Sequence, residues 1–328
     1  FPAHSDRYLP IVVASVVGLA AVVSVFEPNS IPHDVEELYN AAHARLLQLG
    51  HLDKWQTLQY RGHCGGCTHN ALLGSMLFST LGPSLFSWKL VPVLFTALLA
   101  FCGAFVLNRT VGAFGASAFG LLIVFSPPAF LELSMTSWGN HFESGVAAIA
   151  VVAIYHWYSS CPSLPRACSL GLALAWALWI GFSSVFIGFG MAWLLWGRTT
   201  VKHGAVIVAS GCAVGILWSL QAIHTTTTVF DTIYQPGESL PQLTRIPSKL
   251  WSLFGPRQLV ALFGMPHTAG GWIGGWAVAA SGLIAAWVAR KHSAFRPILA
   301  LGVSFLAVYS VVRFTVWTPP APEIAPPG

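Results

Sequence analysis

Apolar segments recur along most of this sequence, and many are long enough to cross a lipid bilayer as a helix. At about 1.5 Å of rise per residue, about 20 residues cover the ~30 Å hydrocarbon layer. Of all residues, 55% are hydrophobic and only 8% are charged. One soluble core cannot bury that much apolar surface, so the sequence predicts an all-α, polytopic transmembrane helical bundle.

We expect about nine membrane crossings. The predicted spans cover residues 8–26, 85–107, 113–125, 142–158, 167–180, 184–196, 205–222, 272–289 and 297–316. The first span ends without the small residues of a cleavage site, so we expect it to be retained. Segment 70–81 is apolar but short, and we expect it to lie along the membrane surface or to dip into it.

The domain organisation follows from these spans. Residues 1–318 are expected to form a single transmembrane domain with outer loops at 27–82 and 223–270. Residues 319–328 are rich in proline and are expected to form an extended tail.

Charge bias between the spans predicts the orientation. One set of turns is basic and lacks acidic residues: Arg109, Arg166, Arg198, Lys202, Arg290, Lys291 and Arg296. The positive-inside rule makes this face cytoplasmic and places the acidic loops outside, in a periplasm or lumen. Because topology explains the net charge of +5, we expect membrane lipid and not nucleic acid as a partner.

The acidic residues Asp34, Glu36 and Glu37 begin an amphipathic run, 36–49, in the first outer loop. Carboxylates are favoured in the first turn of a helix, which explains one or two of them without any further function. A third carboxylate at the membrane surface points to an acidic site. Such a group can remove a proton from an attacking hydroxyl or hold a divalent cation.

Cys64 and Cys67 lie in a compact His-Cys-Gly-Gly-Cys-Thr-His string on the outer face. A haem attachment motif needs a histidine directly after the second cysteine, and here Thr68 intervenes. Four zinc ligands packed this closely are unusual for a tetrahedral site. A disulfide between the two cysteines is the plainest interpretation in an oxidising compartment, ahead of free thiols and of a metal site.

Other polar residues on the outer face suggest a substrate pocket. His141 and Glu143 stand at the mouth of a predicted span, where they are unfavourable unless they face a protein interior or a watery cavity. The cations Lys89, Arg245, Lys249 and Arg257 can interact with lipid head groups, or together bind a departing phosphate.

Several short motifs, in a fixed order, carry a family resemblance. They are Glu36-Glu37-x-Tyr39, Tyr60-Arg61-Gly62, Leu81-Gly82-Pro83-Ser84, Lys89-Leu90-Val91-Pro92, Ser126-Pro127-Pro128 and Gly139-x-His141-x-Glu143. Over residues 34–158 the chain resembles the first half of GT-C fold, polyprenyl-phosphate-dependent glycosyltransferases. This group is related to the dolichyl-phosphate-mannose protein mannosyltransferases.

The resemblance implies specific roles and also shows two departures. The family's Asp-Glu pair falls on Glu36-Glu37, with Asp34 nearby, so either Asp34 or Glu36 takes the role of catalytic base, or the activity is altered or lost. The family's arginine before Leu-Pro is Lys89 here, which keeps the charge and loses the guanidinium fork.

We therefore expect an integral membrane glycosyltransferase that moves a sugar from a lipid-phosphate donor to an acceptor on the outer face of a bacterial inner membrane or its equivalent. The alternative is a non-catalytic membrane subunit that keeps this scaffold within a larger assembly of partner subunits. A transporter is less favoured, because no span carries an ionisable residue near its middle.

Overall fold

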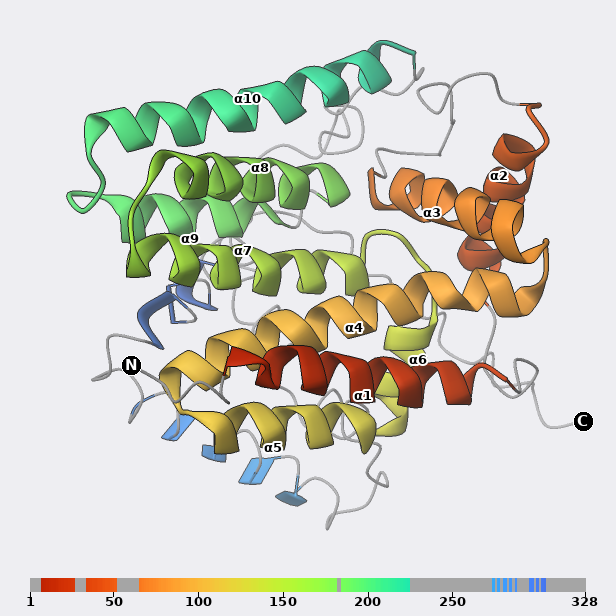
Figure 1. Cartoon of the computed structure of the whole chain (residues 1–328), viewed down its shortest axis with the longest axis horizontal. Helices are drawn as coiled ribbons and strands as arrows, with labels where there is room; N and C mark the ends of the chain where they lie inside the picture. The colour runs from red at the N-terminus through yellow and green to blue at the C-terminus, as the bar shows by residue number, and fades with distance from the viewer. Residues whose placement is uncertain are drawn as a thin grey trace, which may run out of the picture.

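The computed structural model describes residues 7–26, 34–51, 65–181 and 184–224, together with scattered helical residues between 273 and 304. All regular secondary structure in these parts of the chain is helical, and Figure 1 shows the helices gathered in one bundle. The prediction of an all-α fold is confirmed.

The helices follow one another with short connections. In chain order they are α1 (Leu9–Ser24), α2 (Val35–Gln48), α3 (Gly65–Leu81), α4 (Leu85–Thr110), α5 (Ala113–Val124), α6 (Pro128–Met135), α7 (Phe142–Ser160), α8 (Leu164–Ile180), α9 (Val185–Leu195) and α10 (Val201–His224).

Local sequence signals set several of these boundaries. Proline stands in the first turn of α1 and of α8, where its fixed φ suits a helix and its missing N–H is not needed. Ser84 and Ser87 form a capping box at the start of α4, so exposed amides of the first turn are satisfied. Gly82, at φ 83°, adopts the left-handed conformation that separates α3 from α4.

Helix α4 is central to the bundle. It packs against α1 and α5 on one side and against α7 on the other. Helix α8 packs against both α7 and α10. At one end of the bundle, α2 runs across the direction of the long helices and packs on α3 (Figure 1). A buried apolar cluster of Ala44, Ala71, Trp88 and Phe142 ties α2 and α3 to α4 and α7.

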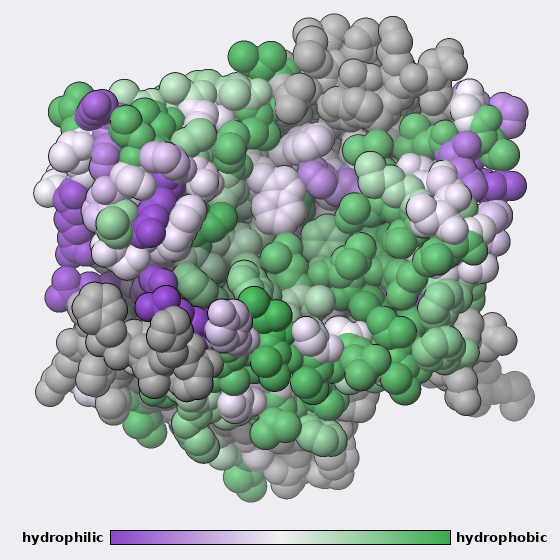
Figure 2. Space-filling view, viewed as in Figure 1, coloured by the Kyte–Doolittle hydropathy of each residue, from purple (hydrophilic) through white to green (hydrophobic). Residues whose placement is uncertain are grey.

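Polar and apolar surfaces are segregated along the bundle. Figure 2 shows hydrophobic side chains across the middle of one face and hydrophilic ones concentrated toward both ends. The last turn of α4, the first turn of α8 and the turn after α9 lie at the end of the bundle opposite α2, and they contain Arg109, Arg166 and Arg198 respectively. Within the described residues, α4 alone is long and apolar enough to cross a membrane, and five shorter helices are also apolar.

Each predicted span up to residue 222 coincides with a helix, and the amphipathic run 36–49 coincides with α2. Helix α6 was not predicted, because it is short and follows Ser126-Pro127-Pro128. The spans 272–289 and 297–316 are described only in part, and helical residues occur within both. That these helices cross a membrane stays a prediction.

Candidate functional site

The predicted polar residues that the structure describes lie at the end of the bundle that holds α2 and α3. Asp34, Glu36 and Glu37 stand at the start of α2, and Lys89 lies in the second turn of α4. The segment of residues 136–141 joins α6 to α7 and is called here the α6–α7 loop. It contains His141, is hydrogen-bonded to α2 through Asn40, and packs closely against the start of α3 at Gly66.

Glu37 and Lys89 form a fully buried ion pair. Lys89 Nζ lies 2.8 Å from Glu37 Oε1 and 2.7 Å from Oε2, and both side chains are 0% exposed. Lys89 Nζ also donates to the Met135 carbonyl at 3.0 Å, and the Ser137 N–H donates to Glu37 Oε1 at 3.2 Å. Buried charges require such partners, so this pair holds α2, α4 and the α6–α7 loop together.

Glu143 forms a second buried polar contact on the other side of the loop. Its Oε1 accepts a hydrogen bond from Asn70 Nδ2 at 2.7 Å and another from the Gly139 N–H at 2.9 Å. Within the described part of the chain, Glu143 Oε2 and Asn70 Oδ1 are buried and have no hydrogen-bond partner. These oxygens are the acceptors that this contact leaves available to a water molecule or a ligand.

Two glycines allow the α6–α7 loop to touch the start of α3. A Cβ placed on Gly66 would lie 1.4 Å from the Gly139 carbonyl oxygen, which no packing tolerates. Gly139 has φ 95°, a conformation that side chains disfavour, and a Cβ there would lie 2.6 Å from the Cys67 nitrogen. The backbone contact between α3 and the loop therefore depends on both residues being glycine.

Asn40 completes the attachment of the loop to α2. This residue is 1% exposed, and its Nδ2 donates to the Ser137 carbonyl at 3.1 Å and to the Trp138 carbonyl at 3.4 Å. Neither Asn40 nor Asn70 was predicted from the sequence. The available signal was an amide side chain among residues that are otherwise small or apolar, since a buried amide requires hydrogen-bond partners.

Asp34 and Glu36 differ from Glu37 because they face outward. Asp34 caps α2 by accepting a hydrogen bond from the Glu36 N–H at 2.7 Å, and Glu36 is exposed. His141 is also exposed, and its ring lies 4.9 Å from that of Trp138. Partial desolvation lowers the pKa of His141 below 6.5, while the charges of Glu36 and Asp34 act in the opposite direction.

The structure thus places the exposed Glu36 and the partly buried Asp34 close enough for their charges to act on the imidazole of His141. The two acids come from α2 and the histidine comes from a loop about a hundred positions later in the chain. A carboxylate or a neutral imidazole can accept a proton from a hydroxyl.

Cys67 is disulfide-bonded, and its Sγ lies 3.6 Å from the Trp138 carbonyl oxygen. Its predicted partner, Cys64, lies outside the described residues, so the pairing stays a prediction. The other cysteines that the structure describes are free thiols: Cys102, Cys161, Cys168 and Cys212.

Three predicted phosphate ligands, Arg245, Lys249 and Arg257, lie outside the described residues. Lys89, the fourth, has its ammonium group on Glu37 in this structure. Among the residues that are described, no group of three or more His, Cys, Asp or Glu side chains is placed to hold a metal ion.

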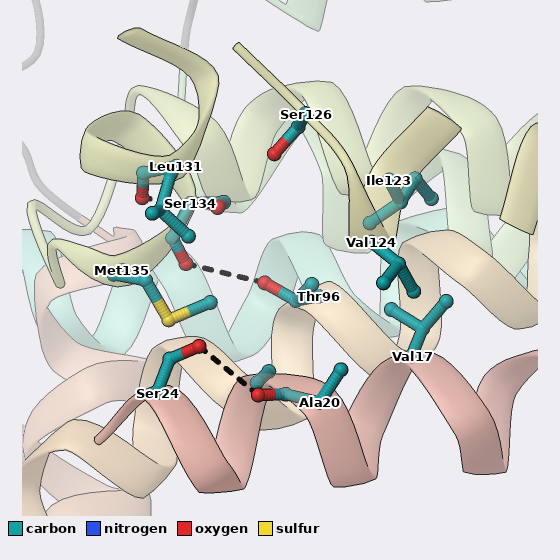
Figure 3. Close-up of a pocket in the computed structure, with 11 residues that line it drawn as sticks. Val17, Ala20, Ser24, Thr96, Ile123, Val124, Ser126, Leu131, Ser134 and Met135 are labelled. Carbon is teal, nitrogen blue, oxygen red and sulfur yellow. Dashed lines mark hydrogen bonds between the residues drawn. The ribbon is translucent and has the colours of Figure 1, made fainter. Parts of the chain in front are cut away.

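A small cavity lies between α1, α4, α5 and α6 (Figure 3). Two hydrogen bonds cross its wall: Thr96 donates to the Ser134 carbonyl at 3.1 Å, and Ser24 donates to the Ala20 carbonyl at 3.0 Å. Its volume is about 30 Å³. That is room for one or two water molecules, so this cavity is too small for a substrate.

Neither a scan against protein-family models nor a search of curated proteins finds a match for this chain.

Proposed function

We propose that this chain is a membrane-embedded glycosyltransferase with about nine crossings and a GT-C-like fold, active on its outer face. The donor is a sugar carried on a lipid phosphate, and the acceptor carries a hydroxyl. The observation that carries the proposal is the convergence of Asp34, Glu36 and His141 at one end of an apolar bundle.

The segregation of surface residues supports the membrane placement. An apolar middle with hydrophilic ends is the surface that a bilayer requires. The basic end, with Arg109, Arg166 and Arg198, is assigned to the cytoplasmic side by the positive-inside rule. The α6–α7 loop and the acidic residues of α2 then lie on the outer side of the membrane.

An apolar groove between α4, α5 and α7 supports a lipid donor. Its volume is about 720 Å³, and it is lined by Leu99, Gly103, Val106, Leu107, Phe119, Leu122, Ile123, Phe125, Ser126, Pro127, Phe130, Ile149 and Val152. The ring of Phe130, one of the lining residues, lies 5.9 Å from the ring of Phe142, which directly follows His141. A hydrocarbon chain in this groove would bring its phosphate end toward the acids.

The proposed reaction is a single displacement. The acceptor oxygen forms a bond to the anomeric carbon while the bond from that carbon to the phosphate oxygen breaks. The acceptor proton passes to Asp34 or Glu36, and the lipid phosphate leaves with the bonding electrons. Inversion at the anomeric carbon follows, and cations of the outer face stabilise the leaving phosphate.

The test replaces each acid without changing its shape. With the chain in nanodiscs and a panel of polyprenyl-phosphate sugars, release of polyprenyl phosphate is measured for Asp34→Asn and Glu36→Gln. One of these variants should lose at least ~100-fold, the usual contribution of a general base. Glu132→Gln changes an exposed carboxylate on α6 and is the matched control. Full turnover in both acid variants would overturn the proposal.

A second candidate function is that of a non-catalytic membrane subunit. The Glu37–Lys89 pair favours it, because two of the predicted reactive groups are 0% exposed and neutralise each other. A subunit of this kind would co-purify with a partner, and no lipid-phosphate sugar of the panel would be consumed.

A further inference from the structure

The outward face of α2 is apolar although it is exposed. Val35, Leu38, Leu46 and Leu49 recur at helical spacing and are 81%, 51%, 39% and 49% exposed. The opposite face of the helix, which includes Glu37, is buried against the rest of the protein. A helix with one buried face and a second, exposed apolar face is suited to the boundary between lipid head groups and acyl chains.

A groove opens beside this face, between α2 and the start of α4. Leu38, Ala42, Phe78, Leu85 and Trp88 are among the residues that line it, and its volume is about 330 Å³. That volume lies within the range of small-molecule sites. Because Leu38 belongs both to the groove and to the exposed apolar face, the two surfaces are continuous.

One cation, Arg45, also lines the groove. It is half-buried and donates a hydrogen bond to the Gln48 side chain. The single ion pair among the described residues is that of Lys89 and Glu37, so no carboxylate in this part of the chain neutralises Arg45. A guanidinium has five N–H donors in a planar fork that matches a phosphate, and most of these donors remain for a ligand.

The groove wall contains one more unused donor. Trp88 is 1% exposed, and its Nε1–H has no acceptor among the described residues. A buried indole N–H normally finds a partner.

We propose that the groove between α2 and α4 binds an anionic glycerophospholipid of the outer leaflet. One acyl chain lies against Leu38, Phe78 and Leu85, and the phosphate accepts hydrogen bonds from Arg45. The apolar wall excludes a purely polar ligand, and the uncompensated guanidinium favours an anionic head group over a zwitterionic one. The inference rests on the membrane placement under Proposed function and is independent of the transfer chemistry.

The test compares lipid retention between two bilayers. The chain is reconstituted in nanodiscs of phosphatidylglycerol and phosphatidylcholine in equal parts, released, and analysed by native mass spectrometry. One phosphatidylglycerol per chain should be retained, with at least ~10-fold preference over phosphatidylcholine, as expected for a charge-assisted bidentate contact. Equal retention of both lipids, or a second copy of the chain bound in place of lipid, would overturn the proposal.

Variants separate the head group from the acyl chain. Arg45→Gln should reduce retention of phosphatidylglycerol about tenfold, and Arg45→Lys by less, because the charge stays and the fork is lost. Ala42→Trp fills the groove and should abolish retention, while Arg166→Gln alters an arginine on α8, away from the groove, and is the matched control. Unchanged retention in Arg45→Gln contradicts the proposal even where Ala42→Trp does not fold.

The outcome is distinct from that of the transferase test. Loss of sugar-donor turnover with intact retention of phosphatidylglycerol would overturn the proposed transferase and support this site. Normal turnover without retained phosphatidylglycerol would support the proposed transferase and overturn this lipid site.

Discussion

Glu36 and Glu37 are neighbours in the sequence, yet their carboxylates have different surroundings in the structure. Glu37 is 0% exposed and paired with Lys89. Glu36 is exposed, and its negative charge raises the pKa of His141. One residue along an α-helix turns the side chain by about 100°, which carries it from the core face to the outer face. Adjacent acids of the same cluster can therefore serve the fold and the chemistry separately.

Removing one partner of the buried Glu37–Lys89 ion pair should have the largest effect on stability. Lys89→Met leaves the Glu37 carboxylate buried without a cation, and we expect the free energy of unfolding to fall by about 3–5 kcal/mol. Glu37→Met combined with Lys89→Met removes both charges and should recover most of that loss. Thermal unfolding in detergent measures both variants. A double variant as unstable as the single one would show that the pair does more than neutralise itself.

Separating the α6–α7 loop from α3 should have the next largest effect. Gly66→Ala places a methyl group against the Gly139 carbonyl, so we expect a loss of about 2–3 kcal/mol from overpacking. Gly145→Ala is the control, because a Cβ there meets nothing within 4 Å, and a helical alanine should stabilise slightly. If both variants unfold at the same temperature, the close contact is absent in solution.

The outward acids should matter less for stability. Asp34→Ala removes the cap of α2 and should lower the free energy of unfolding by about 1 kcal/mol, whereas Asp34→Asn keeps a capping oxygen and should lose only a few tenths. If Asp34 is the base, the same two variants should lose transfer activity equally, because both lack its carboxylate. A difference in activity that follows the difference in stability would assign Asp34 to the fold and not to the chemistry.

The smallest effect concerns the pH dependence at His141. Its folded-state pKa lies below 6.5, so the unfolded chain binds the proton more readily. The contribution of the neutral ring to stability is present above pH 6.5 and is lost as the pH falls through 6.5 toward the folded-state pKa.

Glu36→Gln sharpens this test, because the Glu36 charge raises the pKa of His141. Without that charge the histidine pKa, followed by NMR titration, should fall further. An unchanged value would mean that the two groups do not share one site.

The helices could be predicted from the sequence because apolar length and proline or glycine boundaries are local signals. The predicted span 142–158 corresponds to α7, Phe142–Ser160, and the amphipathic run 36–49 corresponds to α2, Val35–Gln48. The sequence also singled out Glu37 in an acidic cluster, Lys89 among the cations of the outer face, and Glu143 at the mouth of a predicted span. Such residues are rare enough to attract attention by themselves.

The contacts between those residues could not be predicted. Glu37 and Lys89 are 52 positions apart, and Asn70 and Glu143 are 73 positions apart. Which of them meet depends on how α2, α3 and the α6–α7 loop pack, and that depends on close contacts such as Gly66 on Gly139. No local pattern encodes a contact of this kind, because it requires two glycines on separate elements.

The long reach of the Glu37–Lys89 pair also bears on how the protein is made. Lys89 is added 52 residues after Glu37, which takes about 3–10 s at the usual rate of synthesis. Throughout that interval Glu37 has no cation and is favoured in water, so α2 should dock only after α4 has formed. The Ser137 N–H reaches the same carboxylate 100 residues later. The acidic end of the bundle is thus among the last parts of this region to assemble.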